Sequence, residues 1–260
     1  MKGLSVISIC FNNLTDLQKT CFSVDAQNMP PNEHLIINGS SNSEIADWLM
    51  NTPQPTYRKW INERDKGISD AFNKGIEKAE FELIHLIHAG DVYASDQVID
   101  NVTNYFQQHP NVNWASGNIR MNRGGTWIVI GKPFDKKKLY RGMRSVAHPT
   151  WFVKKEVYDK IGPFKLHFKI GMDYDLMCRL KDESYGYINE TIAIFDDSGI
   201  STSNYLDSLK ENVAIYESYF GFSLLCRIWQ FRLRILHSLL QTNFGKWLFA
   251  IKKGLGLANA

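Results

Sequence analysis

The stretch ERDKGISDAFNKGIEKAEFELIHLIHAGD (residues 63–91) decides the fold class, because it joins a helix to a buried strand with a polar end. Between residues 67 and 78 the apolar side chains recur at helical spacing, which predicts an amphipathic helix. Residues 82–87 form a short, almost continuously apolar run, as expected of a strand covered on both faces. The polar residues 88–91 then mark the end of that strand.

The rest of the chain also alternates between strand and helix patterns. Toward the N-terminus we predict strands over residues 4–11, 33–38 and 57–61, and helices over residues 14–27 and 45–50. Such alternation produces right-handed crossovers and a parallel sheet with helices on both faces. We therefore predict an α/β fold with a Rossmann-type, mostly parallel sheet. After residue 91 the pattern is less regular, and we predict further helices and strands over residues 95–108, 113–120, 126–130, 154–161, 173–181 and 186–195.

Composition excludes several classes of protein. The chain has 260 residues, of which 44% are hydrophobic and 22% charged, as is typical of one large globular domain or of a domain with an appendage. The four cysteines lie far apart and form no CxxC pair, so neither a zinc ribbon nor a disulfide framework is expected. No stretch reaches the ~18 apolar residues of a membrane span. The short apolar run at the N-terminus is not a signal peptide, and we expect a cytoplasmic protein.

Charge is unevenly distributed along the chain. After Glu217 there are six basic residues and no acidic one, so residues 218–260 carry +6 and residues 1–217 carry −3. A near-neutral body with a cationic tail is not the pattern of a nucleic-acid-binding protein. We divide the chain into a catalytic domain, residues 1–217, and a basic tail, residues 218–260.

The tail has the pattern of an amphipathic helix. A polar face with Arg227, Gln230 and Arg234 is predicted to lie opposite an apolar stripe formed by Leu224, Leu225, Ile228, Phe231, Ile235 and Leu239. Such a helix can lie on an anionic lipid surface, with its apolar face in the membrane interface. The alternative is a C-terminal helix whose apolar stripe packs on the body of the protein.

Polar side chains cluster where three of the predicted strands end. Phe11 and Asn12 follow the first strand, Asn38 ends the second, and Asp91 follows the fourth. Ligands of parallel α/β sheets bind outside the carboxyl ends of the strands, so these clusters predict a nucleotide site. Each cluster alone is also ordinary turn chemistry. The chain contains neither GxGxxG nor GxxxxGK[ST], which excludes the two commonest phosphate-binding motifs.

Two carboxylates lie at positions suited to chemistry. Asp91 can hold a divalent cation that bridges two phosphates, or it can cap the following helix. We interpret the neighbouring His88 as a polar strand-end residue. Asp173 lies at the start of the helix predicted over residues 173–181, where it can act as a general base or as a helix cap.

The turn at Lys66 and Gly67 begins the helix of the first-quoted stretch. A helix that starts at a strand end directs its positive N-terminus toward the ligand region, so both residues are candidates for binding an anion. Asp70 and Asn73 lie one turn apart on the polar face of that helix and are included with them. The alternative is a solvated helix without a ligand.

Four segments, in this order, are typical of one enzyme family: ERDKGISDAFNKGI, LIHAGD, AHPTWFVKKEVYDKIGPF and GMDYDLMCRL. Together with the later DDSGISTSN (residues 196–204), they resemble bacterial family-2 glycosyltransferases with the GT-A fold, of the kind found in polysaccharide, capsule and O-antigen gene clusters. The resemblance covers about residues 3–205. It implies inverting transfer of a sugar from a nucleoside diphosphate sugar to a hydroxyl group.

The resemblance also implies a role for each candidate residue. The donor, a UDP- or GDP-linked sugar, would be bound by Phe11, Asn12, Asn38, Asp65, Lys66, Gly67, Asp70 and Asn73. Asp91 would bind Mn²⁺ or Mg²⁺ as the carboxylate of a DxD-like motif, and Asp173 would be the catalytic base. His148 and Arg179 match positions on the acceptor side. The implied acceptor is a saccharide, commonly lipid-linked, which agrees with membrane contact through the tail.

The chain departs from the family pattern at two places. Asn38 stands where an aspartate is usual, and the metal motif keeps one carboxylate, with His88 and Ala89 where acidic or polar residues are common. Two alternatives therefore stay open, a catalytically silent sugar-nucleotide-binding scaffold and a nucleotidyltransferase. A nucleotidyltransferase would normally have a glycine-rich basic loop near the N-terminus, which is missing here. The intact Asp173 favours the glycosyltransferase.

Overall fold

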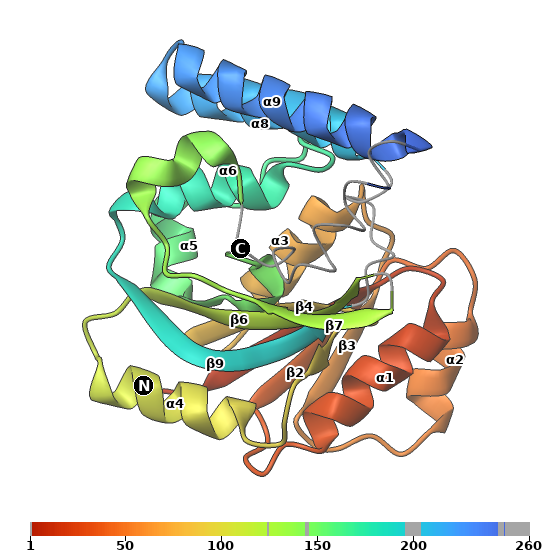
Figure 1. The fold of residues 1–260 in the computed structure, drawn as a ribbon. Coiled ribbons are helices and arrows are strands. Elements are labelled where there is room, and N and C mark those ends of the chain that lie inside the picture. Colours follow the sequence, from red (N-terminus) through yellow and green to blue (C-terminus); the bar gives the residue numbers. More distant parts are fainter. Residues whose placement is uncertain (1, 124, 144–145, 196–203, 244–246, 248–260) are drawn as a thin grey trace.

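The computed structural model describes residues 2–123, 125–143, 146–195, 204–243 and 247. Figure 1 shows a curved central sheet with helices on both faces and a pair of long C-terminal helices above one helical layer. The predicted α/β fold with a mostly parallel sheet is therefore confirmed. Of the segment DDSGISTSN, residues 196–203 lie outside the described residues.

The N-terminal half forms the parallel part of the sheet. Its strands β1 (Leu4–Cys10), β2 (Glu33–Asn38), β3 (Arg58–Asn62) and β4 (Leu83–His88) lie in the order β3-β2-β1-β4. They alternate with helices α1 (Leu14–Asp25), α2 (Glu44–Asn51) and α3 (Ile68–Lys78). The register pairs Cys10 with Asn38, Asn38 with Asn62, and Ile9 with His88. The polar strand ends therefore meet at one edge of the sheet.

The second half extends the sheet past β4 in the order β8-β6-β9-β5, with β7 paired to β6. Its elements are β5 (Val92–Tyr93), α4 (Val98–Gln108), β6 (Trp114–Arg123), β7 (Thr126–Ile130), β8 (Phe152–Lys154), α5 (Lys155–Ile161), α6 (Met172–Arg179) and β9 (Tyr185–Phe195). Short 3-10 turns occur at η1 (Lys136–Arg141), η2 (His148–Thr150) and η3 (Leu180–Asp182). The strands predicted over residues 113–120 and 126–130 are present as β6 and β7, which pair antiparallel as a hairpin. The strands β5 and β8 were not predicted, because two or three residues are too few to show a period.

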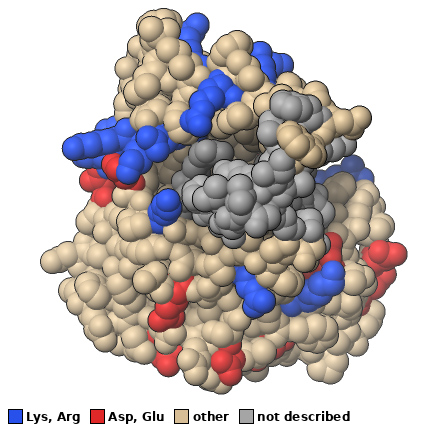
Figure 2. Space-filling model, viewed as in Figure 1, with Lys and Arg blue, Asp and Glu red and all other residues tan. Residues whose placement is uncertain are grey.

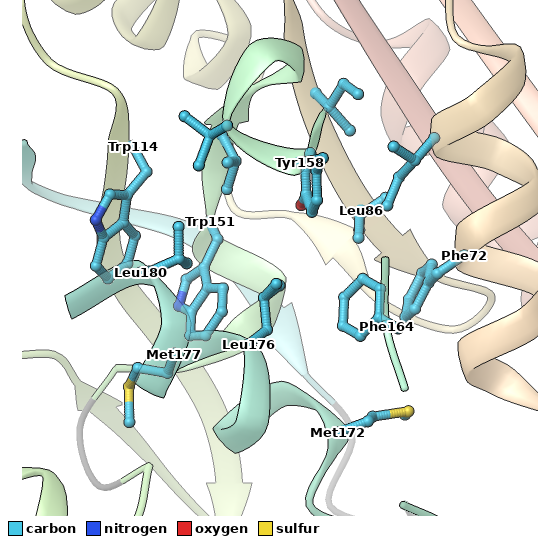
Figure 3. Close-up of a cluster of buried hydrophobic side chains, with 14 of the residues drawn as sticks. Phe72, Leu86, Trp114, Trp151, Tyr158, Phe164, Met172, Leu176, Met177 and Leu180 are labelled. Carbon is cyan, nitrogen blue, oxygen red and sulfur yellow. The ribbon is translucent and has the colours of Figure 1, made fainter. Parts of the chain in front are cut away.

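The largest core cluster lies between the sheet and helices α3, α5 and α6 (Figure 3). Helix α3 packs very close to the sheet, because a Cβ atom on Gly75 would lie 2.4 Å from Cγ2 of Ile7. This close contact fixes the position of the α3 N-terminus relative to the strand ends. A second cluster lies between the other face of the sheet and α4, and a third beneath α1 and α2.

The C-terminal helices α8 (Tyr205–Phe220) and α9 (Leu224–Gln241) pack against each other, and α8 also contacts α6 (Figure 1). The predicted helical tail is therefore present, and the boundary proposed at residue 217 lies inside α8. Ile215 of α8 is buried in the main core cluster, so this helix belongs to the body of the protein. Among the described helices, none has the length and apolarity needed to cross a membrane.

Candidate active site

Asn12 joins the end of β1 to the turn that follows β2. Its backbone has a φ of 54°, a left-handed conformation that asparagine tolerates better than most residues. In this conformation its N–H donates to Oγ of Ser40 at 2.9 Å, and its Oδ1 accepts from the N–H of Ser41 at 3.0 Å. The neighbouring Phe11 leaves its ring 60% exposed at the same edge. Two strand ends that are distant in sequence thus form one surface.

Asn38 is buried and uses its whole amide to shape this edge. Its Oδ1 accepts from the N–H of Ser40 at 3.1 Å, and its Nδ2 donates to Oδ1 of Asn62 at 2.9 Å. A carboxylate at this position has no hydrogen atom to donate, whereas an amide can donate and accept. The departure from the usual aspartate therefore suits the neighbouring Asn62, and the side chain of Asn38 supports the turn that carries Ser40.

Asp65 lies directly against the turn after β2. A Cβ atom on Gly39 would lie 1.8 Å from Oδ2 of Asp65, so only glycine fits there. Oδ1 of Asp65 accepts from the N–H of Gly67 at 2.9 Å and thereby orders the turn before α3. The structure therefore brings Phe11, Asn12, Asn38 and Asp65 together, and we call these four residues the strand-end cluster.

The four predicted donor residues around the start of α3 divide into two pairs. Gly67 has a φ of +115° and open space where a Cβ would lie, and Lys66 is exposed beside it. Asp70 instead accepts from the N–H of Lys66 at 2.9 Å and so ties the turn before the helix to its first turn. Asn73 exchanges two hydrogen bonds, of 2.9 and 2.7 Å, with the backbone of Phe164. Lys66 and Gly67 thus border open space, while Asp70 and Asn73 hold α3 in place.

Asp173 is the second residue of α6 and faces two histidines from other elements. Its Oδ1 lies 3.9 Å from Nδ1 of His148, which is beyond hydrogen-bond distance. Both atoms are buried, and neither has a hydrogen-bond partner within the described part of the chain. The side chain of Asp173 keeps 23% of its surface exposed, so a ligand can reach it. Buried polar atoms without partners are uncommon and indicate a place where a ligand or water binds.

The protonation states around Asp173 follow from burial. Desolvation raises the pKa of Asp173 to about 6, although nearby His88 counteracts part of this rise. Desolvation also lowers the pKa of His88 to about 4 and that of His148 to about 3, so both imidazoles are neutral near pH 7. A carboxylate that is ionised at neutral pH and has a raised pKa is well suited to accept a proton.

An aromatic wall causes this burial and links the two halves of the site. The ring of Phe72 lies 4.9 Å from that of His88 and 5.4 Å from those of His148 and Phe164. Figure 3 shows Phe72 beside Phe164, with Met172 of α6 nearby. Oγ of Ser69 lies 3.0 Å from Sδ of Met172, so the N-termini of α3 and α6 are adjacent. Asp173 therefore borders the helix that begins next to the strand-end cluster.

Asp91 and His88 lie in the turn that ends β4. Oγ1 of Thr20, in α1, donates to the carbonyls of Asp91 and His88 at 2.8 and 3.2 Å, which fixes this turn. The backbone at Gly90 also approaches Asp16, because a Cβ there would lie 3.6 Å from Cβ of Asp16. The sequence interpretation of His88 as an ordinary strand-end residue misses its place beside Asp173.

The side chains of this turn can hold a metal ion only if a bound ligand supplies further coordinating oxygens. Among the described residues, no group of three or more His, Cys, Asp or Glu side chains is arranged to hold a cation. Mg²⁺ in nucleotide sites is commonly held by one or two carboxylates together with substrate phosphates. Asp91, which is 4% exposed, fits the role of such a single protein ligand.

Arg179 lies in a buried charge cluster and not beside Asp173. Its Nε and Nη2 donate to Oδ2 of Asp175 at 3.0 and 2.7 Å, and its Nη1 donates to the carbonyls of Ile161 and Gly162. Asp175 is fully buried, and its Oδ1 accepts from Tyr219 and Lys165 at 2.7 and 3.1 Å. The predicted acceptor role of Arg179 is not supported by this geometry, because all three of its nitrogens have partners inside the protein.

Glu211 of α8 caps the loop that leads into α6. Its Oε2 accepts from the N–H groups of Gly171 and Ile170 at 2.6 and 3.1 Å, and its Oε1 accepts from Lys169 at 3.3 Å. The loop packs tightly against α8 at Gly171, since a Cβ would lie 2.6 Å from Cδ1 of Ile215. No sequence pattern singles out Glu211, because its partners are backbone groups of a distant loop.

Comparison with known proteins identifies the family. The family described as Glycosyl transferase family 2 matches residues 5–162, which contain the strand-end cluster, Asp91 and His148. The chain belongs to glycosyl transferase family 2. An uncharacterized glycosyltransferase of Mycobacterium tuberculosis is 32% identical over 180 residues, which cover 68% of each chain. The family resemblance inferred from the sequence is thereby confirmed.

Solved structures of two other proteins share the fold. Staphylococcus aureus TarS 1-349 in complex with UDP-GlcNAc has a TM-score of 0.62 at 11% identity, covering 85% of this chain and 68% of that one. The present chain covers 40% of a longer TarS structure. Mannosyltransferase PcManGT of Pyrobaculum calidifontis, solved with GDP-Man and Mn²⁺, has a TM-score of 0.60 at 11% identity, covering 99% and 81%. These matches confirm the predicted GT-A-like architecture of this family-2 glycosyltransferase.

We predict that Arg179→Met destabilises the enzyme, because it removes the main cationic partner of the buried Asp175 carboxylate. Breaking a buried pair from one side typically costs about 3–5 kcal/mol in the free energy of unfolding. Urea denaturation followed by circular dichroism measures this loss. Lys136→Met is the control, since its pair with Asp182 is exposed and should contribute less than about 1 kcal/mol. If Arg179→Met lowers the free energy of unfolding by less than about 1 kcal/mol, its pair with Asp175 contributes little to stability, and a role of Arg179 in ligand binding becomes the better explanation.

Proposed function

We propose that this family-2 enzyme is an inverting glycosyltransferase that moves a sugar from a nucleoside diphosphate sugar to a hydroxyl group of a saccharide. The observation that carries this proposal is Asp173, a buried carboxylate with a raised pKa whose Oδ1 has no hydrogen-bond partner among the described residues. It lies next to the start of α3, and the strand-end cluster lies on the other side of that start. A proton acceptor and a candidate donor site thus share one edge of the sheet.

The proposed reaction is a single displacement at the anomeric carbon. The acceptor hydroxyl oxygen forms the new bond to that carbon and loses its proton to Asp173, while the bond to the diphosphate breaks and the diphosphate leaves with the electron pair. Oδ1 of Asp173 and Nδ1 of His148 lie 3.9 Å apart, so a hydroxyl group placed beside both atoms would donate to the carboxylate and, with the imidazole proton on Nδ1, accept from the histidine. Because both histidines are neutral, neither one protonates the base before the reaction.

The donor is proposed to bind along the strand ends, with UDP and GDP as the candidate nucleotides. TarS and PcManGT have been solved with UDP-GlcNAc and GDP-Man, respectively. Two features of this chain support the same location. One is the strand-end cluster with its exposed Phe11, and the other is the open N-terminus of α3 at Lys66 and Gly67. We propose that Asp91 holds Mn²⁺ or Mg²⁺, which would neutralise charge on the diphosphate.

The proposed acceptor is a lipid-linked saccharide at the cytoplasmic face of the membrane, used to build a bacterial surface polysaccharide. All four cysteines are free and buried, which agrees with a reducing compartment. The rival interpretation is a silent sugar-nucleotide-binding scaffold. A scaffold has no use for a buried carboxylate that lacks a partner, because such a group lowers stability without contributing to binding. Hydrolysis of the donor in the absence of acceptor separates the two, since a scaffold releases no sugar.

We predict that Asp173→Asn abolishes transfer and at the same time stabilises the fold. Loss of a general base typically costs about 100- to 10,000-fold in turnover, while the nearly isosteric amide should preserve donor binding. The folded-state pKa of about 6 lies above the unfolded value of about 3.9, so the folded chain binds a proton more tightly and loses stability as pH rises through this window. Removing the charge should therefore raise the free energy of unfolding near neutral pH by about 2–3 kcal/mol.

Transfer rates and urea denaturation, each measured from acidic to mildly alkaline pH, test this prediction together. The wild-type kcat/KM should fall with unit slope below about pH 6, because only the ionised carboxylate accepts the proton. Asp182→Asn, which changes an exposed carboxylate, should match the wild type in both measurements. Turnover above about a tenth of wild type in Asp173→Asn would exclude this residue as the base.

We predict that Asp91→Asn removes the effect of metal on nucleotide binding. Calorimetric titration of UDP and GDP should show tighter binding to the wild type with Mn²⁺ than with a chelator, and equal binding to the variant in both conditions. Asp96→Asn, an exposed aspartate after β5, should behave as the wild type. Equal affinities in the wild type with and without Mn²⁺ would show that Asp91 does not hold a metal for the nucleotide.

We predict that Glu211→Ala lowers kcat at least tenfold and leaves the dissociation constant of the donor nucleotide unchanged. Glu211 fixes the loop immediately before Asp173, and small misplacements of a catalytic group can cost about 100-fold in rate. Glu211→Gln should recover part of the rate, since its amide oxygen still accepts hydrogen bonds. Asp207→Ala, on an exposed position of the same helix, is the control. An unchanged kcat in folded Glu211→Ala would show that the cap only contributes stability.

A further inference from the structure

The outward face of α9 is an exposed apolar stripe. Its residues, which we call the outer stripe, are each between 36% and 62% exposed: Leu224, Leu225, Ile228, Phe231, Ile235 and Leu239. Phe222, in the turn before α9, is 72% exposed and extends the same apolar region. Soluble proteins rarely leave a contiguous apolar region of this size facing water, and such a region usually marks an interaction site.

The opposite face of α9 holds the helix on the protein. Cys226, Gln230 and Leu233 are buried, and Nε2 of Gln230 donates to the carbonyl of Tyr140 at 3.1 Å. The sequence had left open a helix whose apolar stripe packs on the body. The structure contradicts that alternative, because α9 packs through the face that carries Gln230 and its outer stripe points away. Gln230 was predicted on the polar face, and it is a buried contact instead.

Basic side chains lie along one side of the outer stripe and within it. At about 100° of rotation per residue, Arg227 and Arg234 lie along one side of the stripe, and Arg232 lies between Leu239 and Leu225. A groove of about 580 Å³ between α8 and α9 is lined by Ile228 and Phe231 of the stripe, and its charged lining residues are Lys210, Arg227 and Arg234. In Figure 2 the upper helical layer displays basic side chains, while the acidic ones on this face lie lower. Two of these cations are paired with acidic residues of α8, Arg227 with Glu217 and Lys210 with Asp207.

We propose that the outer stripe docks this enzyme on an anionic lipid bilayer. An exposed apolar helix face with two arginines along one edge and a third among the apolar residues matches a bilayer interface, where acyl chains meet anionic headgroups. A second copy of the chain fits this surface less well. In a twofold contact the arginines that border one stripe would face those of the other copy, and like charges would meet. After Glu217 the sequence offers no acidic residue to neutralise them.

This surface and the candidate active site lie on opposite sides of α8. Glu211, Ile215 and Tyr219 recur at helical spacing and form the inward side of α8, where they contact the α6 region. α9 packs on α8 and carries the outer stripe. Docking would therefore leave α9 and α8 between the lipid surface and the α6 region that carries Asp173. This last point rests on the proposed function, because it matters only if the acceptor is lipid-linked, whereas the docking itself does not depend on that function.

Sedimentation of the full chain with lipid vesicles tests the proposal. We expect binding to vesicles that contain phosphatidylglycerol, weaker binding at high salt and little binding to phosphatidylcholine alone. The double variant Ile228→Glu, Phe231→Glu should lose at least tenfold in binding. The matched control is Phe22→Glu, Met50→Glu, because these side chains are 65% and 61% exposed on α1 and α2, and it should bind as the wild type does. Melting curves establish that both double variants are folded.

Two outcomes would overturn the proposal. One is a wild-type chain that stays in the supernatant with phosphatidylglycerol vesicles, and the other is equal sedimentation of the wild type and the stripe variant. If light scattering then shows that the wild type is a dimer and that the stripe variant is a monomer, the stripe is a contact between two copies of the chain. Hydrolysis of the donor is measured in parallel in solution, and its rate should be equal in the wild type and both double variants. If neither the wild type nor either double variant hydrolyses the donor, the proposed transferase function is disproved. The result of the vesicle experiment is not affected by that outcome.

Discussion

The buried carboxylate of Asp175 determines how the helices above the sheet are arranged. A charge without water must be matched by donors in place, or the folded state loses several kcal/mol. Arg179 supplies two of these donors from α6 itself, Lys165 supplies one from the segment after α5, and Tyr219 supplies one from α8. Satisfying one carboxylate therefore fixes α8 and the segment after α5 relative to α6, and the loop that leads into α6 is fixed with them.

Asp173 and Asp175 lie in the same helix and have opposite surroundings. Asp175 is fully buried and has a partner for each oxygen, whereas Asp173 is partly accessible and its Oδ1 has no hydrogen-bond partner among the described residues. The first arrangement stabilises the fold, and the second lowers stability near neutral pH because burial disfavours the ionised form. Local instability of this kind is common at functional sites, where a group must be free to react. The well-matched charge beside it is what keeps the helix rigid while Asp173 remains available.

The sequence predicts those features that depend on local periodicity or on strand ends. The alternation of strands and helices, the two strands β6 and β7, and the meeting of Asn12 with the turn after Asn38 all follow from such patterns. The partners of long polar side chains do not follow, since Arg179 and Asn73 satisfy backbone carbonyls and amides of segments far away in the chain. His88 could not be recognised either, because its neighbourhood is created by α6, which joins β4 only in three dimensions.

The orientation of α9 shows the same limit and supports the link between its surface and the site. Periodicity reveals an apolar stripe but does not say which side of the helix meets the protein. α9 packs through a face that contains a glutamine, and Nε2 of Gln230 donates there to the carbonyl of Tyr140, while its Oε1 is buried without a partner among the described residues. The buried Cys226 and Leu233 complete this inner face, so the stripe is left outside. α8 carries α9 on one side and caps the loop before Asp173 through Glu211 on the other. One helix, α8, therefore contacts both the helix that carries the outer stripe and the loop that leads to Asp173.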